Sequence, residues 1–200
     1  MPRSSESTAR LPRAVLFDRD GTLIADVPYN GDPALVDPMP GARALLDELR
    51  AAGVLVGIVS NQSAIGRGLI TTAQYEAVTA RLTELLGAFD VILACPHLPT
   101  DGCDCRKPAP GMVLEACRRL EVPPATTVVI GDIGSDIQAA HRAGASGILV
   151  PTPVTRAAEV GACRHVARDL AEAAELIRSG AWSGPAWADT ERADTGEAAR

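Results

Sequence analysis

Two aspartates separated by one residue carry the first chemical signal in this sequence. Asp18 and Asp20 come directly after the apolar run 14–17 and are followed by Gly21 and Thr22. Residues at a spacing of two in an extended segment can point to the same side. Neighbouring carboxylates can hold a hard cation, and one can stay ionised while the other carries a proton. The alternative is a solvated Asp-x-Asp-Gly turn, and this motif alone does not decide between the two.

Polar groups also follow three later stretches of the chain. Residues 60–68 read Ser-Asn-Gln-Ser-Ala-Ile-Gly-Arg-Gly, so hydroxyl, amide and backbone donors can point at a phosphate there. Arg106 and Lys107 precede a proline and are placed to grip an anion, and Asp132 and Asp136 follow another apolar run. Each group could be a solvated charge or a helix cap. Four such sites in succession are harder to explain by capping.

A cluster of metal-ligating residues lies directly before the two cations. Cys95, His97, Cys103 and Cys105 fall in a loop-like segment rich in Pro, Gly and Asp. Three thiolates and one imidazole at this spacing match a tetrahedral zinc site, although cysteines also occur as ordinary buried apolar residues. Four protein ligands leave no open position, so the sequence predicts a structural zinc ion that holds the segment after it.

The elements that must position these groups follow from the apolar pattern. The predicted strands, which are continuous apolar runs typical of a buried parallel sheet, are residues 14–17, 54–59, 90–94, 126–130 and 145–150. The predicted helices are residues 41–52, 71 or 72 to 86, 112–120 and 169–177. Alternation of strands and helices predicts an α/β fold with a central parallel sheet, in which ligands bind beyond the carboxyl ends of the strands.

Composition bounds the class of protein. The chain has 200 residues, 46% of them hydrophobic and 3% aromatic, with a formal net charge of −6. We expect a disordered leader at 1–12, one domain at 13–178 and a disordered tail at 179–200. The acidic balance argues against nucleic acid as a partner. The chain shows neither a targeting segment nor the ~18 apolar residues of a membrane span, so we expect a cytoplasmic protein without membrane association. We expect a monomer, although no pattern specifies the oligomeric state.

Taken together, these motifs resemble the haloacid dehalogenase (HAD) superfamily, subfamily IIIA. The resemblance rests on Asp18–Thr22, Ser60, Lys107 and Asp132 with Asp136, in that order. The zinc loop and the Ser-Asn-Gln-Ser segment resemble the heptose 1,7-bisphosphate phosphatases and the related histidinol-phosphate phosphatases. The resemblance implies a Rossmann-like, three-layer α/β/α fold. The short gaps between the motifs imply that no separate cap domain is present.

The resemblance also implies a mechanism. Asp18 would attack phosphorus and form an aspartyl-phosphate, and Asp20 would act as general acid and then as general base. Asp18, the backbone carbonyl of Asp20 and Asp132 would hold Mg²⁺. Ser60, the backbone N–H of the next residue and Lys107 would stabilise the phosphoryl oxygens. Asp136 would orient Lys107 or a metal-bound water.

The expected function is therefore Mg²⁺-dependent hydrolysis of a small sugar phosphate, with a D,D-heptose 1,7-bisphosphate as the leading candidate. The residues expected to contact the sugar or a distal phosphate are Asn61, Gln62, Arg67 and Arg106. The alternatives are a histidinol-phosphate phosphatase, a polynucleotide 3′-phosphatase and a non-catalytic zinc-stabilised binding module. Ala64, where the heptose enzymes are expected to have glycine, and the loop 24–40 leave the identity of the sugar open.

Overall fold

The computed structural model describes residues 11–187 and shows a five-stranded parallel sheet with helices on both faces. The strands are β1 (Ala14–Phe17), β2 (Leu55–Asn61), β3 (Val91–Cys95), β4 (Thr127–Gly131) and β5 (Ser146–Leu149). Their order is β3-β2-β1-β4-β5. Phe17 lies beside Ile58 of β2 and Ile130 of β4. The residues that follow β1, β2 and β4 therefore meet at one edge of the sheet, as predicted.

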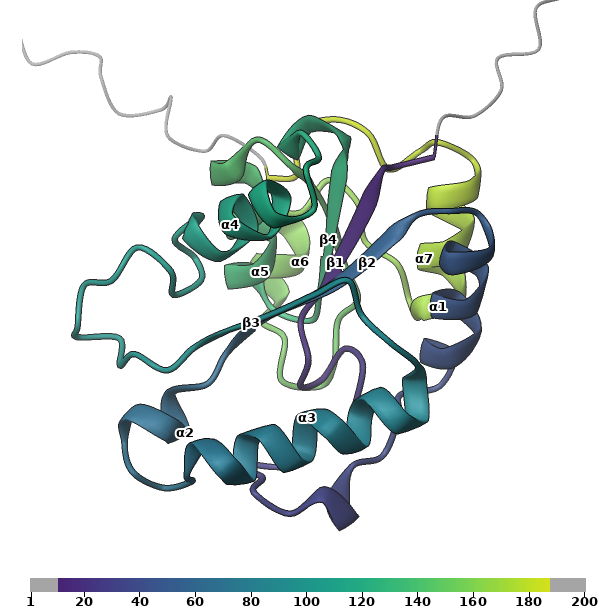
Figure 1. Cartoon of the computed structure of the whole chain (residues 1–200). Helices are drawn as coiled ribbons and strands as arrows, with labels where there is room; N and C mark the ends of the chain where they lie inside the picture. The colour runs from purple at the N-terminus through teal and green to yellow at the C-terminus, as the bar shows by residue number, and fades with distance from the viewer. Residues whose placement is uncertain (1–10, 188–200) are drawn as a thin grey trace, which may run out of the picture.

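Helices cover both faces of the sheet (Figure 1). The helices are α1 (Ala42–Ala51), α2 (Ser63–Gly66), α3 (Thr72–Leu86), α4 (Gly111–Arg119), α5 (Gly134–Ala143), α6 (Ala157–Ala162) and α7 (Leu170–Arg178), with 3-10 turns at Pro33–Leu35 and Pro124–Thr126. Val15 and Phe17 pack into a core with α1, α3 and α7, whereas Ala14 and Leu16 pack into a second core with α4 and α5. Alternate residues of β1 thus serve opposite faces, and the predicted three-layer α/β/α fold is confirmed.

Helix α3 illustrates how local sequence sets the position of an element near the site. The Thr71 hydroxyl accepts from the Gln74 backbone N–H (3.2 Å), and the Gln74 side chain accepts from the Thr71 backbone N–H (2.8 Å). This reciprocal cap starts the helix. Val78, Leu82 and Leu86 are spaced by four residues and are fully buried against the sheet. The cap and the buried stripe fix the rotation of α3.

The loop after β1 is closed at its base. Ile24 pairs with Pro38 in an antiparallel bridge, and the Ala25 N–H donates to the Asp37 carbonyl (2.8 Å). The Met39 N–H donates to the Leu23 carbonyl (2.9 Å). Residues 26–37 therefore form a loop whose two ends are hydrogen-bonded to each other.

The prediction of a disordered tail from residue 179 is wrong for residues 179–187. Trp182 is 5% exposed and belongs to the core beside α7, and Ala186 is fully buried against the other face. Trp187 pairs with Cys163 in an antiparallel bridge. The segment is held by Trp182, Ala186 and Trp187 among serine, glycine and proline residues, a composition that is also typical of disordered tails. The remaining tail and leader residues, 188–200 and 1–10, lie outside the described residues.

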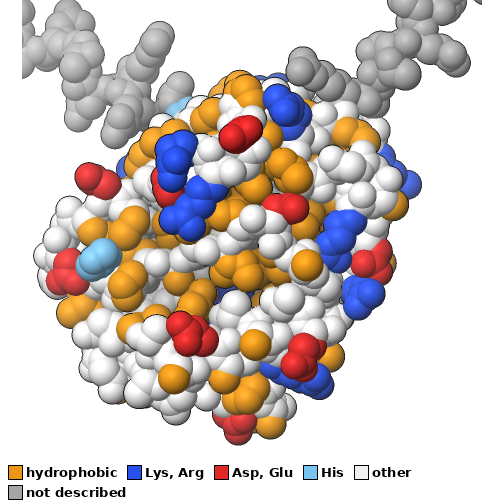
Figure 2. Space-filling model, viewed as in Figure 1, with side chains coloured by type: hydrophobic (Ala, Val, Ile, Leu, Met, Phe, Trp, Pro, Cys, Tyr) orange, Lys and Arg blue, Asp and Glu red, His pale blue; other side chains and the backbone are white. Residues whose placement is uncertain are grey.

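Two surface properties bear on the expected partners. On the face seen in Figure 2, basic side chains lie in small separate groups among acidic ones and form no continuous basic field. Over residues 11–187, no helix has both the length and the apolar character needed to cross a bilayer.

Candidate active site

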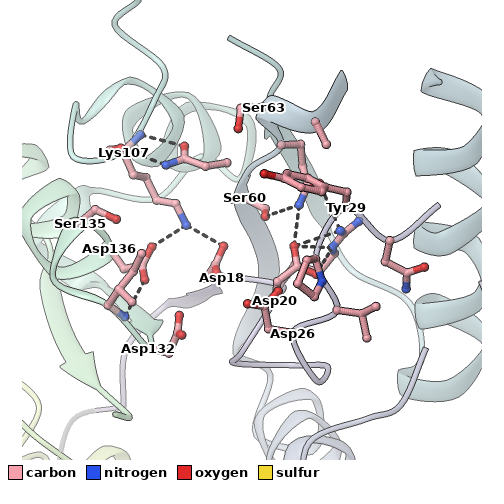
Figure 3. A pocket seen from close by; sticks show the side chains of 18 of the residues that line it. Asp18, Asp20, Asp26, Tyr29, Ser60, Ser63, Lys107, Asp132, Ser135 and Asp136 are labelled. Carbon is pink, nitrogen blue, oxygen red and sulfur yellow. Dashed lines mark hydrogen bonds and ion pairs between the residues drawn. The ribbon is translucent and has the colours of Figure 1, made fainter. Parts of the chain in front are cut away.

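A cavity of about 390 Å³ lies beyond the carboxyl ends of β1, β2 and β4. Eight residues predicted from the sequence line it: Asp18, Asp20, Ser60, Asn61, Gln62, Lys107, Asp132 and Asp136. Figure 3 shows Asp18, Lys107 and Asp136 on one side, and Ser60 and Asp20 on the other. The structure thus brings the four predicted motifs together around one space.

Lys107 is a buried cation between two carboxylates. Its Nζ lies 2.7 Å from Asp18 Oδ1 and 2.6 Å from Asp136 Oδ1, and it donates to the Val59 carbonyl (2.7 Å). Burial alone lowers the pKa of the Lys107 ammonium, but the charges of Asp136 and Asp18 outweigh burial and raise that pKa above its usual value. Lys107 therefore stays protonated and fixes the orientation of the Asp18 carboxylate.

Three carboxylates crowd the same side of the cavity. Oxygen atoms of Asp18, Asp132 and Asp136 all lie within 4.8 Å of one another. Burial, followed by the charges of Asp18 and Asp136, raises the pKa of Asp132 to about 7. Gly21 packs directly against Asp132, because a Cβ at this position would lie 2.5 Å from Asp132 Oδ2. The cluster carries more negative charge than Lys107 balances, and its all-oxygen donor set fits Mg²⁺.

Asp136 is the least available of the three acids as a metal ligand. One of its oxygens pairs with Lys107, and the other accepts from the Ile133 N–H (3.2 Å). Burial raises the pKa of Asp136 to about 6, although the Lys107 charge opposes the shift. This geometry agrees with the expectation that Asp136 orients Lys107 while Asp18 and Asp132 hold the cation.

We expect Mg²⁺ to stabilise the metal-free protein more at alkaline than at acidic pH. The pKa of Asp132 is about 7 in the folded chain, against an ordinary value of 3.8 for an aspartate side chain, so the folded state binds the proton more tightly. The stability that this proton supplies is lost as pH rises from about 4 to about 7, and Mg²⁺ can then replace it. Thermal melts at about pH 5.5 and about pH 8, with EDTA or excess Mg²⁺, measure the two shifts. The Asp132→Asn variant, which lacks this carboxylate, serves as the control and should show only a small Mg²⁺ shift at either pH; equal Mg²⁺ shifts at both pH values in the wild type would contradict this assignment.

Asp20 lies on the opposite wall, among neutral and cationic partners. The Arg19 guanidinium donates to both of its carboxylate oxygens, at 3.0–3.2 Å, and Gln62 Nε2 donates to Oδ2 (2.7 Å). Burial raises the pKa of Asp20; the Arg19 charge opposes this shift, and the Asp18 charge adds to it. Asp18 and Asp20 thus occupy different environments, as a division of roles between two acids requires.

Gln62 joins Asp20 to Ser60. Its Nε2 donates to Ser60 Oγ (2.9 Å) as well as to Asp20, and its Oε1 accepts from Arg19 (3.2 Å). Because Ser60 Oγ accepts this bond, its own O–H remains available for a ligand oxygen. Both N–H groups of the Gln62 amide are therefore used within the protein, which leaves only its oxygen for the sugar contact expected from the sequence.

Asn61 also has a different task from the predicted one. Its side chain accepts from the Lys107 backbone N–H (3.0 Å) and donates to the Lys107 carbonyl (3.0 Å). The end of β2 thereby fixes the backbone at Lys107.

The predicted zinc ligands converge in the loop after β3. His97 Nδ1 lies 3.5 Å from Cys95 Sγ and 3.2 Å from Cys105 Sγ, and the three sulfurs are 3.2–3.7 Å apart. Sulfurs bound tetrahedrally at about 2.3 Å from zinc lie roughly 3.8 Å apart, so the donor set fits this ion. Burial and the neighbouring sulfurs raise the pKa of the Cys105 thiol to about 12. A cation bound at this cluster would favour the thiolate form that burial opposes at Cys105.

Removing two of these ligands should damage both stability and activity. The Cys103→Ser/Cys105→Ser variant frees the segment that leads directly into Lys107, while Asn61 still holds that residue. We expect a lower melting temperature, loss of bound zinc and a fall in kcat/KM of about 10- to 100-fold, because small misplacements of catalytic groups have effects of this size. Zinc content, thermal melting and phosphate release measure these effects. Cys163→Ser, outside the cluster, is the control; full activity and unchanged melting of the double variant would contradict the role given to zinc.

Two residues expected to contact substrate lie away from the cavity. Arg67 follows α2 and is exposed. The Arg106 side chain donates to the His97 carbonyl (3.2 Å) and lines a separate hollow of about 280 Å³ with Arg142. Neither side chain lines the space that holds the acids.

The lining also includes residues that the sequence did not single out as candidates, among them Arg19, Asp26, Tyr29 and Val154. Tyr29 is 56% exposed and has a φ of 56°, and Val154 is 70% exposed. The available signal for Arg19 was its place between two candidate acids. Tyr29 and Val154 had no such signal, because exposed apolar side chains in loops are common.

Comparisons with known proteins match this chain to HAD-like hydrolases. A family model described as HAD-hydrolase-like matches residues 104–173. The D-glycero-beta-D-manno-heptose-1,7-bisphosphate 7-phosphatase of Bordetella bronchiseptica is 36% identical over 149 residues, covering 70% of this chain and 81% of that protein. The Escherichia coli K12 protein of the same name is 36% identical over 179 residues, covering 82% of this chain and 93% of that protein.

A solved structure agrees with these sequence matches. The crystal structure of D,D-heptose 1,7-bisphosphate phosphatase from B. bronchiseptica, complexed with magnesium and phosphate, superposes with a TM-score of 0.70 at 32% identity. The match covers 82% of this chain and 97% of that one.

Proposed function

This chain belongs to the HAD-like hydrolase family and is a phosphatase, and from that premise we propose that it hydrolyses a small sugar phosphate, a D,D-heptose 1,7-bisphosphate, with Mg²⁺ as cofactor. The observation that carries this proposal is the convergence of Asp18, Asp20, Lys107 and Asp132 around one cavity. The B. bronchiseptica structure with magnesium and phosphate supports the choice of cofactor.

Asp18 is the proposed nucleophile. Lys107 pairs with Asp18 Oδ1 at 2.7 Å, which leaves the other carboxylate oxygen to attack phosphorus. The new bond from Asp18 to phosphorus forms as the bond from phosphorus to the sugar oxygen breaks. Water then hydrolyses the aspartyl-phosphate, which divides one difficult displacement into two easier ones.

Asp20 is the proposed proton carrier. Its proton passes to the leaving sugar oxygen, and the resulting carboxylate then accepts a proton from the attacking water. Its burial raises its pKa, which favours the protonated form that the first step needs. Its position opposite Asp18 keeps the proton carrier apart from the nucleophile.

The phosphoryl oxygens need positive charge and hydrogen-bond donors. The Lys107 ammonium, the free O–H of Ser60 and the Asn61 backbone N–H are the proposed donors. Mg²⁺, held by Asp18, Asp132 and the Asp20 carbonyl, would supply further positive charge beside the phosphoryl group. Cys95, His97, Cys103 and Cys105 would hold a structural Zn²⁺, which would support the segment leading to Lys107 from outside the cavity.

Histidinol phosphate is the second candidate substrate, on the strength of one observation. Both cations that line the cavity are already paired with acids, and the outer wall carries Asp26 and Tyr29 instead. An ammonium or imidazole group suits such a wall, whereas a second phosphate does not. The names of the curated relatives favour the heptose bisphosphate. No observation favours a polynucleotide, and a purely non-catalytic module is set aside because the chain is a phosphatase.

A substrate panel tests the proposal. Phosphate release should be measured for the α and β heptose 1,7-bisphosphates, histidinol phosphate and a 3′-phosphorylated oligonucleotide. We expect kcat/KM for one heptose anomer to exceed that for histidinol phosphate by about tenfold or more, since recognition of a leaving group by hydrogen bonds discriminates at least this strongly. Preference for histidinol phosphate would overturn the substrate and leave the phosphatase chemistry intact.

A further inference from the structure

Arg19 is a buried cation that the chemistry proposed above does not use. Its side chain is 3% exposed, although Arg19 follows the carboxyl end of β1 and stands between Asp18 and Asp20 in the sequence. Nε lies 3.1 Å from Asp20 Oδ1 and 3.2 Å from Oδ2, and a terminal nitrogen lies 3.0 Å from Oδ2. A guanidinium that donates to both oxygens of a carboxylate fixes the plane of that group as well as its position.

The remaining contacts of Arg19 fix the guanidinium itself. The nitrogen that donates to Asp20 Oδ2 also donates to Gln62 Oε1 (3.2 Å), and the Tyr75 ring of α3 lies 5.4 Å from the guanidinium carbon. The other terminal nitrogen is buried without a hydrogen-bond partner in the described residues. Leaving this buried N–H without a partner costs free energy. The contacts to Asp20 and Gln62 therefore determine where the guanidinium lies.

The hydrogen bonds distinguish the two oxygens of Asp20. Oδ2 accepts from Arg19 twice and from Gln62 once, whereas Oδ1 accepts from Arg19 alone. Oδ1 is therefore the oxygen with room to carry a proton and present it to the cavity. Gln62 in turn contacts Ser60, so the proton carrier and the proposed donor to the phosphoryl group share one rigid support.

We propose that Arg19 is a positioning residue that holds Asp20 so that Oδ1 delivers its proton to the leaving oxygen of the substrate. In this step the Oδ1–H bond breaks and a bond from that proton to the leaving oxygen forms, while the electron pair of the breaking phosphorus–oxygen bond stays on that oxygen. The inference rests on the proposed function, because it assigns Asp20 the role of general acid. The competing interpretation is a buried ion pair that only maintains the fold.

Leaving groups of different basicity separate the two interpretations. A sugar alkoxide needs protonation as it leaves, whereas nitrophenolate does not, so misplacement of the acid should matter only for the sugar phosphate. For Arg19→Met we expect kcat/KM to fall about 100-fold on the preferred sugar phosphate, the scale of general acid catalysis, and less than about threefold on p-nitrophenyl phosphate. The ratio kcat/KM is used because it reports the phosphoryl transfer step and not the later hydrolysis.

Two further variants complete the test. Arg19→Lys keeps the charge but cannot donate to both oxygens in one plane, so we expect its loss to be selective for the sugar phosphate and smaller than that of Arg19→Met. Arg81→Met, an exposed arginine of α3 that pairs with Glu84, should behave as wild type on both substrates. Circular dichroism melting shows whether each variant folds, and Arg19→Lys carries the test if Arg19→Met does not.

The outcomes are distinct. Equal losses on both substrates in a folded variant would overturn the positioning role and leave Arg19 as a structural ion pair. Retention of full activity on the sugar phosphate would overturn it as well. Failure of the wild type to turn over any sugar phosphate would contradict the proposed substrate. That outcome is distinct from the two above, because it is seen in the wild type and not in an Arg19 variant.

Discussion

Replacing Asp18 with asparagine is expected to reduce kcat by about 10⁴-fold or more, because an amide cannot supply the attacking oxygen of a covalent mechanism. The substitution keeps the shape of the side chain. It also removes one negative charge from a cluster in which Asp132 and Asp136 already repel it, so the protein should remain folded. Phosphate release and thermal melting of the same preparation measure the two effects.

A second Asp→Asn variant, at a surface position, serves as the control for this experiment. Asp47 lies on the surface of α1 and pairs with Arg43 and Arg50, away from the cavity. Asp47→Asn should keep wild-type turnover and nearly wild-type melting, because exposed ion pairs contribute little to stability. Substantial turnover by folded Asp18→Asn would remove the nucleophile from the proposed mechanism.

Replacing Lys107 with methionine should have the largest effect on stability. Lys107 is 3% exposed and its ammonium contacts Asp18 and Asp136, so its removal leaves buried carboxylates without their cation. Breaking one side of a buried ion pair commonly costs about 3–5 kcal/mol. We also expect kcat to fall about 100- to 1,000-fold, as happens when one charge-stabilising group is removed. Denaturant unfolding with EDTA and steady-state kinetics with Mg²⁺ measure these losses.

Magnesium and a neighbouring residue provide the controls for this variant. Because Mg²⁺ also neutralises the acid cluster, it should restore part of the lost stability but not the lost turnover. Arg106→Met changes a cation in the same segment that lies outside the cavity, and it should cost less than about 1 kcal/mol. Wild-type unfolding of Lys107→Met in EDTA would show that the acids do not depend on this ammonium.

Much of the framework could be read from the sequence, because apolar runs and strand-end polar groups report it directly. The run before Asp18 has no polar residue, which is characteristic of a strand covered on both faces, and β1 does lie between β2 and β4. The cysteine spacing likewise indicated four ligands that the structure brings together. Such features depend on local sequence and on a few topological rules.

The directions of individual side chains could not be read in the same way. Gln62 and Asn61 were expected to face the substrate, but they bridge neighbouring strand ends through Asp20, Ser60 and Lys107. These contacts join residues more than 40 positions apart, except for the pair Ser60 and Gln62. Trp182 was missed for a related reason, since a tryptophan among small residues gains its packing partners only in three dimensions.

The closed base of the loop after β1 has a consequence for how this enzyme can diversify. The bridge between Ile24 and Pro38 closes the base of residues 26–37, a segment that supplies Asp26 and Tyr29 to the outer wall of the cavity but none of the acids that perform the reaction. Insertions, deletions or exchanges within this segment need not disturb the sheet. Substrate preference can therefore change through replacement of residues 26–37 while the catalytic acids stay the same. Grafting this loop between relatives is a route for engineering.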